Sequence, residues 1–207
     1  MPEQLFVDSS QPRSGVPDGA RRRWLILGVG WFAMTSTSCY VYGIPMLVPA
    51  IRASGGVSLA RAGVVVAAPG LGVLLTLFAW GYAADRWGER LVITSGLAGA
   101  AAFLGAACAV SGLTALSVLL VCAGACGASV NAASGRVVLG WFAASERGFA
   151  MGVRQTAQPL GVGIAALVMP ALARHDLREA FVFPAALCVV AAILALVLVI
   201  DPPRHGA

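Results

Sequence analysis

One short charged stretch decides the fold: Gly81-Tyr82-Ala83-Ala84-Asp85-Arg86-Trp87-Gly88-Glu89-Arg90. It follows the pattern G-x-x-x-D-R-x-G-x-R and separates two strongly apolar runs. Each run is long enough to cross the hydrocarbon core of a bilayer as a helix, which takes about 20 residues. The stretch is therefore predicted to be a tight turn between two membrane-spanning helices.

Composition supports the same interpretation for the whole chain. Its 207 residues are 59% hydrophobic and 11% charged, whereas a soluble domain carries about 25% charged residues. The sequence thus predicts an all-α, polytopic protein embedded in a lipid bilayer. The net charge of +5 comes without a basic run interleaved with aromatic residues, which argues against nucleic acid as a partner.

Six apolar runs are predicted to form six transmembrane helices within a bundle over residues 24–200. The expected spans are 24–48, 59–83, 91–110, 114–142, 149–173 and 180–200. Residues 1–23 are expected to be a flexible N-terminal tail, and residues 201–207 a C-terminal tail. Three arginines, Arg21 to Arg23, precede the first run as in a signal peptide. That run is too long for a signal sequence and no small-x-small cleavage site follows it, so we expect a retained helix.

The arginines predict the orientation of this bundle. One side would carry eight of them, Arg13, Arg21, Arg22, Arg23, Arg86, Arg90, Arg147 and Arg204, and the other side four, Arg52, Arg61, Arg174 and Arg178. Cytoplasmic loops hold the excess of positive charge, so both termini are expected in the cytoplasm. The membrane would be the inner membrane of a bacterium.

Small residues recur at helical spacing and predict close packing between helices. The pairs are Gly63/Ala67, Ala68/Gly72, Ser95/Gly99, Ala101/Gly105 and Gly124/Ala128.

The residues of the charged turn have individual physical roles. Gly81 would let another helix press against its backbone, and Asp85 would lie near a helix N-terminus or pair with an arginine. Gly88 would permit the reversal of the chain with a positive φ. Arg86 and Arg90 would lie at the lipid headgroups.

This turn, placed after the second of six spans, resembles the signature loop of the major facilitator superfamily, a group of secondary transporters. The resemblance implies that the chain is an N-terminal six-helix half, because ordinary family members have two such halves. It also implies that Gly81, Asp85, Arg86, Gly88 and Arg90 form a gating loop that contacts the second half. Glu89 departs from the family, which often has a basic residue there.

A second resemblance covers the fourth and fifth spans. The segments 137–142, 145–148, 151–156 and 159–161 are similar to the corresponding stretch of many bacterial members, and residues 201–204 resemble the start of the family's central linker. The antiporter pattern G-P-x-x-G-G is not met, since Gln158 precedes Pro159. Proline and glycine are expected to loosen the fifth helix.

Polar residues on the first span form one face at i+3 and i+4 spacing: Gly28, Trp31, Thr35, Ser38 and Tyr42. In the family the first and fourth helices border the substrate path, which adds Asn131 to the candidate substrate cavity. The alternative is that Thr and Ser bond back to their own helix while Trp and Tyr lie at the membrane interfaces. Both interpretations stay open at this point.

Two arginines lie within spans. Arg154 and Gln158 share a face of the fifth span, and both are candidate cavity residues. Arg154 would bind an anionic solute through its planar fork, or would snorkel to the headgroups. Arg136, near the end of the fourth span, is expected to snorkel.

Other chemistry is not indicated. None of the nine acidic residues lies deep in a span, so neither an enzyme nor a proton carrier on the path is predicted. The five cysteines fall in apolar runs without metal-ligand neighbours and are interpreted as packing residues. We expect no catalytic residues, no metal and no cofactor.

The predicted function is transport of a small solute, anionic if Arg154 binds it, by a half-length unit that needs a second six-helix half. That second half would come from a homodimer or from another chain. Two alternatives remain: a non-transporting membrane module for binding or regulation, and an inactive remnant of a transporter. The substrate and the coupling ion are not predicted.

Overall fold

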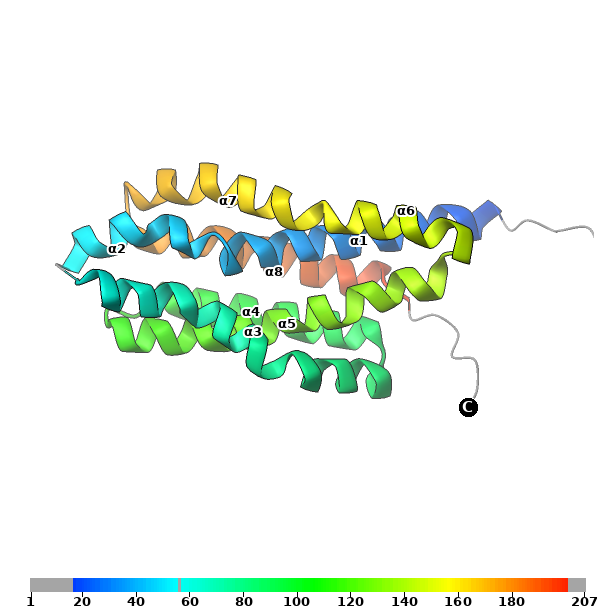
Figure 1. The fold of residues 1–207 in the computed structure, drawn as a ribbon, viewed down its shortest axis with the longest axis horizontal. Helices are drawn as coiled ribbons and strands as arrows, with labels where there is room; N and C mark the ends of the chain where they lie inside the picture. The colour runs from blue at the N-terminus through cyan, green and yellow to red at the C-terminus, as the bar shows by residue number, and fades with distance from the viewer. Residues whose placement is uncertain (1–16, 56, 201–207) are drawn as a thin grey trace, which may run out of the picture.

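The computed structural model describes residues 17–55 and 57–200, and this part of the chain contains helices and no strand. The elements are α1 (Pro17–Val41), the 3₁₀ helix η1 (Ile44–Leu47), α2 (Val48–Gly55), α3 (Leu59–Trp87), α4 (Glu89–Ala107), α5 (Leu113–Trp141), α6 (Ala144–Gln155), α7 (Ala157–Ala173) and α8 (Leu177–Leu198). They lie roughly parallel in one elongated bundle (Figure 1).

Six helical stretches are long and apolar enough to cross a membrane: 21–53, 59–87, 89–107, 113–141, 144–173 and 177–198. This confirms the six predicted spans and the all-α class. The first span combines α1, η1 and α2, and the fifth combines α6 and α7. Most of the predicted N-terminal tail and the whole C-terminal tail lie outside the described residues.

Several helices begin earlier than the apolar pattern suggests. Helix α1 starts at Pro17 rather than at residue 24, and the fifth span starts at Ala144 rather than at residue 149. Glu146 lies in the first turn of α6, where the helix dipole favours negative charge. Helix α8 starts at Leu177 because the side chain of Asp176 caps it, accepting from the Arg178 N–H at 2.9 Å. Polar residues at helix starts therefore lengthen spans beyond their apolar cores.

The fifth span is interrupted at Thr156, between α6 and α7. Pro159 follows three residues later, and it has no N–H to donate to the carbonyl of Gln155, with which its ring would clash in a continuous helix. The Thr156 N–H instead bonds the Val153 carbonyl at 3.2 Å. The predicted loosening of this helix is thus a defined break at one residue.

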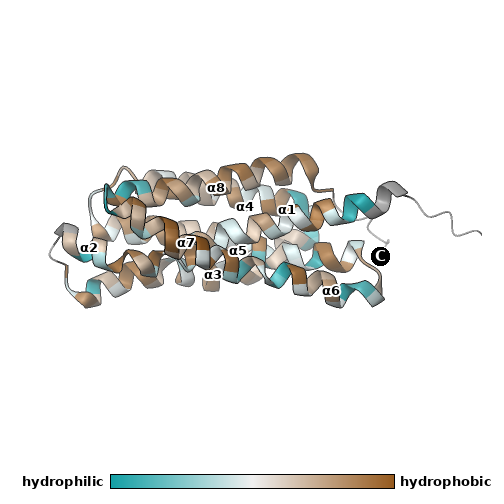
Figure 2. Cartoon of the chain, turned by 90° about the horizontal axis from the view of Figure 1, so that it is seen from above, coloured by the Kyte–Doolittle hydropathy of each residue, from teal (hydrophilic) through white to brown (hydrophobic). Residues whose placement is uncertain are grey.

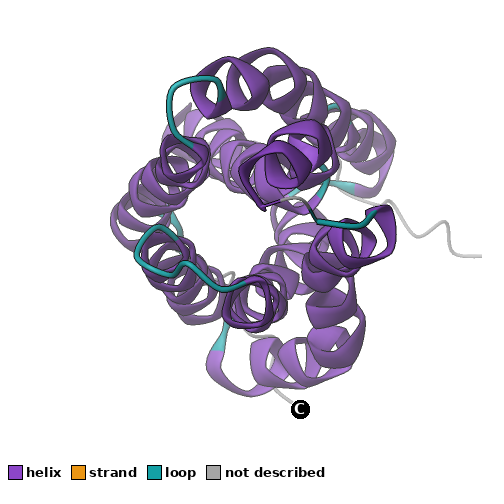
Figure 3. Cartoon of the chain, turned by 90° about the vertical axis from the view of Figure 1, so that its left-hand side faces the viewer, coloured by secondary structure: helices purple, strands orange, loops and turns teal. Residues whose placement is uncertain are grey.

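Contacts between helices arrange the spans around α5 and α1. Helix α5 packs on α3, α4 and α1, while α1 also packs on α7 and α8, and α4 packs on α8. Figure 3 looks along the bundle and shows these helices side by side. Spans distant in sequence, such as the first and the fifth, are therefore neighbours.

The backbones of α3 and α5 pack closely against each other. A Cβ at Gly72 would overlap the carbonyl of Val121, and a Cβ at Gly124 would overlap the carbonyl of Pro69. This confirms the Ala68/Gly72 and Gly124/Ala128 pairs as contact surfaces. By contrast, nothing lies within 4 Å of a Cβ built at Gly63 or Gly105, so their pairs are not contacts within the described residues.

Hydrophilic residues are most frequent towards the ends of the bundle, and its middle is mainly hydrophobic with some polar residues (Figure 2). The start of α6, the α3–α4 turn, the first described residues of α1 and the end of α8 meet at one end (Figure 1). The predicted arginine-rich side is therefore one end of the molecule. Large apolar side chains project outward from α3, where Phe78 is 87% exposed, as expected for a surface that faces lipid or another helix.

Candidate functional site

Three spans bring predicted cavity residues together near the middle of the bundle. Ser38 and Tyr42 from the first span, Asn131 from α5 and Gln158 from α7 line one small pocket of about 20 Å³ with Thr37, Val41 and Val73. Such a volume holds about one water molecule. Ser38 is buried, while Tyr42 and Asn131 are exposed. Asn131 is thus a polar side chain exposed within a span, where contact with hydrocarbon would be unfavourable.

Trp31 and Thr35, two further predicted residues on α1, meet the break in the fifth span. The Trp31 indole donates from Nε1 to Oγ1 of Thr156 at 2.9 Å. The Thr35 hydroxyl donates to the carbonyl of Trp31 at 3.0 Å and approaches that of Ala157 at 3.3 Å. Thr35 is 4% exposed, so it lies under the polar face, and the back-bonding alternative describes its hydroxyl correctly.

Arg154 takes a different position from Gln158, although the two were expected on one face. Its side chain is buried against α5, where Nε donates to Oγ of Ser134 at 3.0 Å and Nη1 donates to Oε1 of Gln155 at 2.9 Å. The break at Thr156 separates the two helical segments, so the i+4 spacing no longer places both side chains together.

Snorkelling does not describe Arg154 in the structure, because its side chain is buried and bonds to Ser134 and Gln155. The fifth span begins at Ala144 rather than at residue 149, and ten residues of helix separate Arg154 by about 15 Å from the start of α6.

The gating-loop residues form an ion-paired turn. Asp85, in the last turn of α3, pairs with Arg136 of α5, and Nε of Arg136 lies 3.4 Å from Oε1 of Glu89. The expectation that Asp85 pairs with an arginine is confirmed. Arg136 therefore bonds to these two carboxylates, and the expected snorkelling to lipid headgroups is wrong.

Gly88 links α3 directly to α4 with φ 92° and ψ 161°, which confirms the expected positive φ. Arg90 donates from Nη2 to the Leu196 carbonyl in the last turn of α8, where the helix dipole favours a cation. Arg90 is thus bonded to protein, and its expected place at the lipid headgroups stays a prediction. Arg86 is exposed.

Gly81 does not contact another helix among the described residues. Nothing lies within 4 Å of a Cβ built at this position, so the expected close approach is wrong for this part of the chain.

Sequence reasoning missed two groups that the structure brings to these sites. Ser134 lies one helical turn after Asn131 on α5 and orients Arg154; the i+3 spacing from Asn131 was the available signal. Glu146 accepts from Arg23, with Nη2 to Oε1 at 3.0 Å, and joins the starts of α6 and α1. No local pattern indicates this pair, because 123 residues separate its members.

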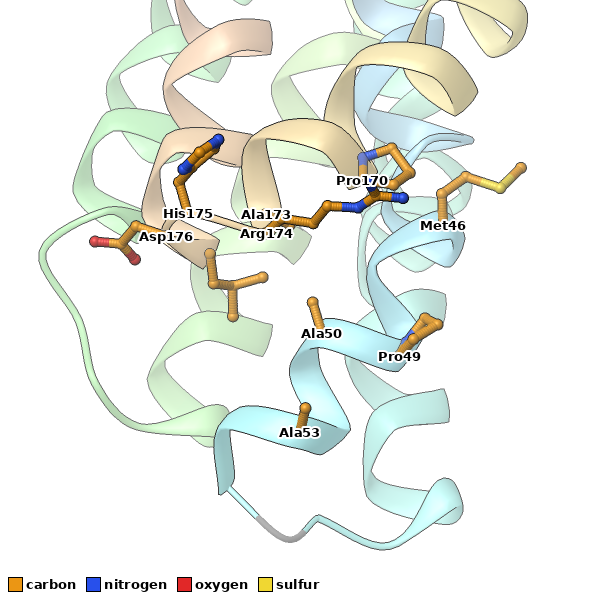
Figure 4. Close-up of a pocket in the computed structure, with 10 residues that line it drawn as sticks. Met46, Pro49, Ala50, Ala53, Pro170, Ala173, Arg174, His175 and Asp176 are labelled. Atoms are coloured by element: carbon orange, nitrogen blue, oxygen red, sulfur yellow. The ribbon is translucent and has the colours of Figure 1, made fainter.

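A larger pocket of about 770 Å³ lies at the opposite end of the bundle, between α2 and the α7–α8 turn. Figure 4 shows Pro49, Ala50 and Ala53 of α2 on one side and Arg174, His175 and Asp176 of the turn on the other. Its charged residues are exposed, so the pocket is an open depression at the mouth of the bundle.

Among the described residues, the cysteines and potential metal ligands form no disulfide and no metal-binding cluster. All five cysteines are free, and no group of three His, Cys, Asp or Glu side chains that could hold a metal occurs within residues 17–55 and 57–200. Cys108 follows α4, outside the spans, and burial raises the pKa of its thiol, which keeps it protonated and poorly nucleophilic.

Comparison with known proteins identifies the family to which this architecture belongs. The family model described as Major Facilitator Superfamily matches residues 26–207. Two curated relatives from Mycobacterium tuberculosis, the uncharacterized MFS-type transporters Rv2994 (strain H37Rv) and MT3072 (strain CDC 1551), are each 40% identical over 190 residues. The alignments cover 92% of this chain and 43% of each relative, so the chain spans less than half their length.

Solved structures agree in fold. A bacterial homologue of the human lysosomal transporter Spinster matches 93% of this chain and 45% of its own in an inward-facing, unoccupied conformation, with a TM-score of 0.74 and 14% identity. The same kind of protein in its occupied conformation gives a TM-score of 0.73. The match of the family model to residues 26–207, with relatives at 40% identity, shows that the chain belongs to the major facilitator superfamily.

Proposed function

We propose that this chain is the N-terminal half of a secondary transporter, and that a small solute passes along the face lined by Ser38, Tyr42, Asn131 and Gln158. The protein would lie in the inner membrane of a bacterium with both termini in the cytoplasm, because one end of the bundle carries most of the arginines. The charge that Arg154 brings near this face favours an anionic solute.

The observation that carries the proposal is the convergence of polar side chains from three spans on one small pocket. Gln158 lies near the middle of the span 144–173, and Ser38 near the middle of the span 21–53. Transporters of this architecture bind their solutes near the midplane, between two repeats. Polar groups at that depth would be costly against lipid, which supports their exposure to a water-filled path.

A second six-helix half is part of the proposal. The chain covers 43% of its curated relatives, and an exposed Asn131 in mid-span needs cover other than hydrocarbon. The second half would be another copy of this chain, a separate chain, or a continuation of the same polypeptide. The gating role of the loop 81–90 depends on that half as well.

The first experiment is the native mass of the purified chain in lipid nanodiscs. A dimer, or a complex with another six-span chain, supports a two-half transporter. A folded monomer favours the alternative of a non-transporting binding or regulatory module. A chain that only aggregates contradicts both and favours an inactive remnant.

A second experiment tests the path itself. Single cysteines would be placed at Asn131 and at Leu74 in a cysteine-free background, and their reaction with a charged, membrane-impermeant thiol reagent would be measured in native membranes. Leu74 is the matched control, because it is 69% exposed on the outward face of α3. We expect reaction at position 131 and none at position 74. Equal protection of both positions would contradict an aqueous path along this face.

A further inference from the structure

Arg154 is a buried cation within the fifth span. Its exposed fraction is 8%, and it lies about 15 Å along the helix from the start of the fifth span. A buried guanidinium is strongly unfavourable unless an opposite charge compensates it. The surroundings of Arg154 can be compared with those of Arg23 and Arg136, two half-buried arginines that form ion pairs.

The comparison shows an asymmetry. Arg23 pairs with Glu146, and Arg136 pairs with Asp85 and Glu89. Arg154 has only the neutral oxygens of Ser134 and Gln155 as partners. Within residues 17–55 and 57–200, no carboxylate lies within 4.0 Å of it. Its positive charge is held in place and left without a counter-charge.

Part of the guanidinium has no partner in the described part of the chain. Nη2 forms no hydrogen bond there, and it is not among the fully buried atoms. Ser134, which accepts from Arg154, follows Asn131 by one turn of α5. Arg154 is thus held against α5 about one helical turn from Asn131, a residue of the small pocket.

We infer that Arg154 binds the negatively charged group of the solute, a carboxylate or another oxyanion. This inference rests on the proposed transport function and names the substrate class. A planar guanidinium binds such groups through charge-assisted hydrogen bonds. Ser134 and Gln155 are positioning residues: they fix the fork without neutralising it, so the anion itself supplies the missing charge.

The test is thermal unfolding of the purified chain in nanodiscs made of phosphatidylcholine alone. Sodium acetate, phosphate and sulfate would each be compared with sodium chloride at equal sodium concentration. The variants are Arg154→Gln, Arg154→Lys and Ser134→Ala. Arg147→Gln is the matched control, because Arg147 lies two turns earlier on α6, is exposed and donates to backbone carbonyls.

We expect at least one of these anions to raise the unfolding temperature of the wild type above the chloride value. Arg154→Gln should abolish this shift, and Arg147→Gln should keep it. Loss of the hydrogen bond in Ser134→Ala should weaken the anion affinity roughly tenfold, and Arg154→Lys should weaken it because a point charge replaces the fork. These last two variants decide the question if Arg154→Gln does not fold.

Two results would overturn the inference. One is a wild type that no anion of the panel stabilises, which would mean that an acidic side chain of the second half compensates Arg154. The other is an anion effect that survives in Arg154→Gln, which would place the anion elsewhere. Failure of the proposed transport function is a separate outcome. If position 131 does not react with the thiol reagent but the anion effect still depends on Arg154, the anion site is retained and the transport proposal is refuted.

Discussion

Arg136, near the end of α5, forms an ion pair with Asp85 in the last turn of α3. Its Nε also lies 3.4 Å from Glu89, the first residue of α4. One arginine therefore ties the α3–α4 turn to a third helix. Glu89 is 8% exposed. Its buried carboxylate therefore needs Arg136 as a partner more than the carboxylate of Asp85 does, because Asp85 is exposed to solvent.

Removal of Arg136 should destabilise the chain through Glu89. In Arg136→Met a buried carboxylate loses its cation, and we expect a loss of about 1–3 kcal/mol, less than for a fully buried pair because Arg136 is itself 40% exposed. The measurement is the unfolding temperature in detergent. The double variant Arg136→Met/Glu89→Gln should recover part of the loss, since it no longer buries an unpaired charge. A double variant as unstable as the sum of its parts would contradict this account.

Gly88 should tolerate no side chain. Its φ of 92° with ψ of 161° lies in a region that is nearly restricted to glycine, so Gly88→Ala should cost about 1–3 kcal/mol. Gly81→Ala is the matched control in the same motif: its Cβ would meet open space, and alanine favours a helix by about 0.5–1 kcal/mol over glycine. The expected order of unfolding temperatures is Gly81→Ala at or above wild type, and Gly88→Ala below both.

The number of spans and the position of the turn at residues 81–90 could be predicted from the lengths of the apolar runs. Twenty or more apolar residues leave few alternatives in a bilayer, so the six spans and the turn at residues 81–90 followed directly. Helix starts were less predictable because Glu146 and Asp176 are polar, and their role depends on the helix dipole and on capping rather than on hydropathy. For that reason Arg154 lies farther from the start of its helix than the expected span 149–173 implies.

The site was predictable within a helix and not between helices. Spacing along the first span placed Ser38 and Tyr42 on one face, and they do share a pocket. The partners across helices, such as Ser134 for Arg154 and Thr156 for Trp31, depend on the mutual register of the helices. Packing sets that register, through close contacts such as Gly124 on Pro69. A single sequence does not give the distances between residues on different helices.

The contact between α3 and α5 gives a third expectation. Gly72→Ala and Gly124→Ala each place a methyl group against a backbone carbonyl of the facing helix, and overpacking of this kind costs about 1–3 kcal/mol. Gly105→Ala, on α4, is the control with open space. The measurement is the yield of folded chain in detergent together with its unfolding temperature. Equal tolerance of all three substitutions would show that the helices adjust their separation freely.

The pair of Arg23 and Glu146 fastens the start of α1 to the start of α6. Arg23 donates both terminal nitrogens to the two carboxylate oxygens, and its guanidinium carbon lies 5.4 Å from the ring centroid of Phe142 and 6.0 Å from that of Trp24. These contacts limit the exposure of the Arg23 side chain to 24%, so the pair is protected from water and salt better than most surface pairs.

A double-mutant cycle measures the strength of this pair. Arg23→Gln, Glu146→Gln and the double variant should give a coupling free energy of about 1 kcal/mol, above the median for exposed pairs because two hydrogen bonds are charge-assisted. Arg22→Gln is the control, since Arg22 is exposed on the preceding residue of α1. Arg23→Lys should retain less than half of the coupling, because lysine lacks the fork geometry and the stacking on Phe142. A coupling near zero would mean that the aromatic contacts alone hold these two helix starts together.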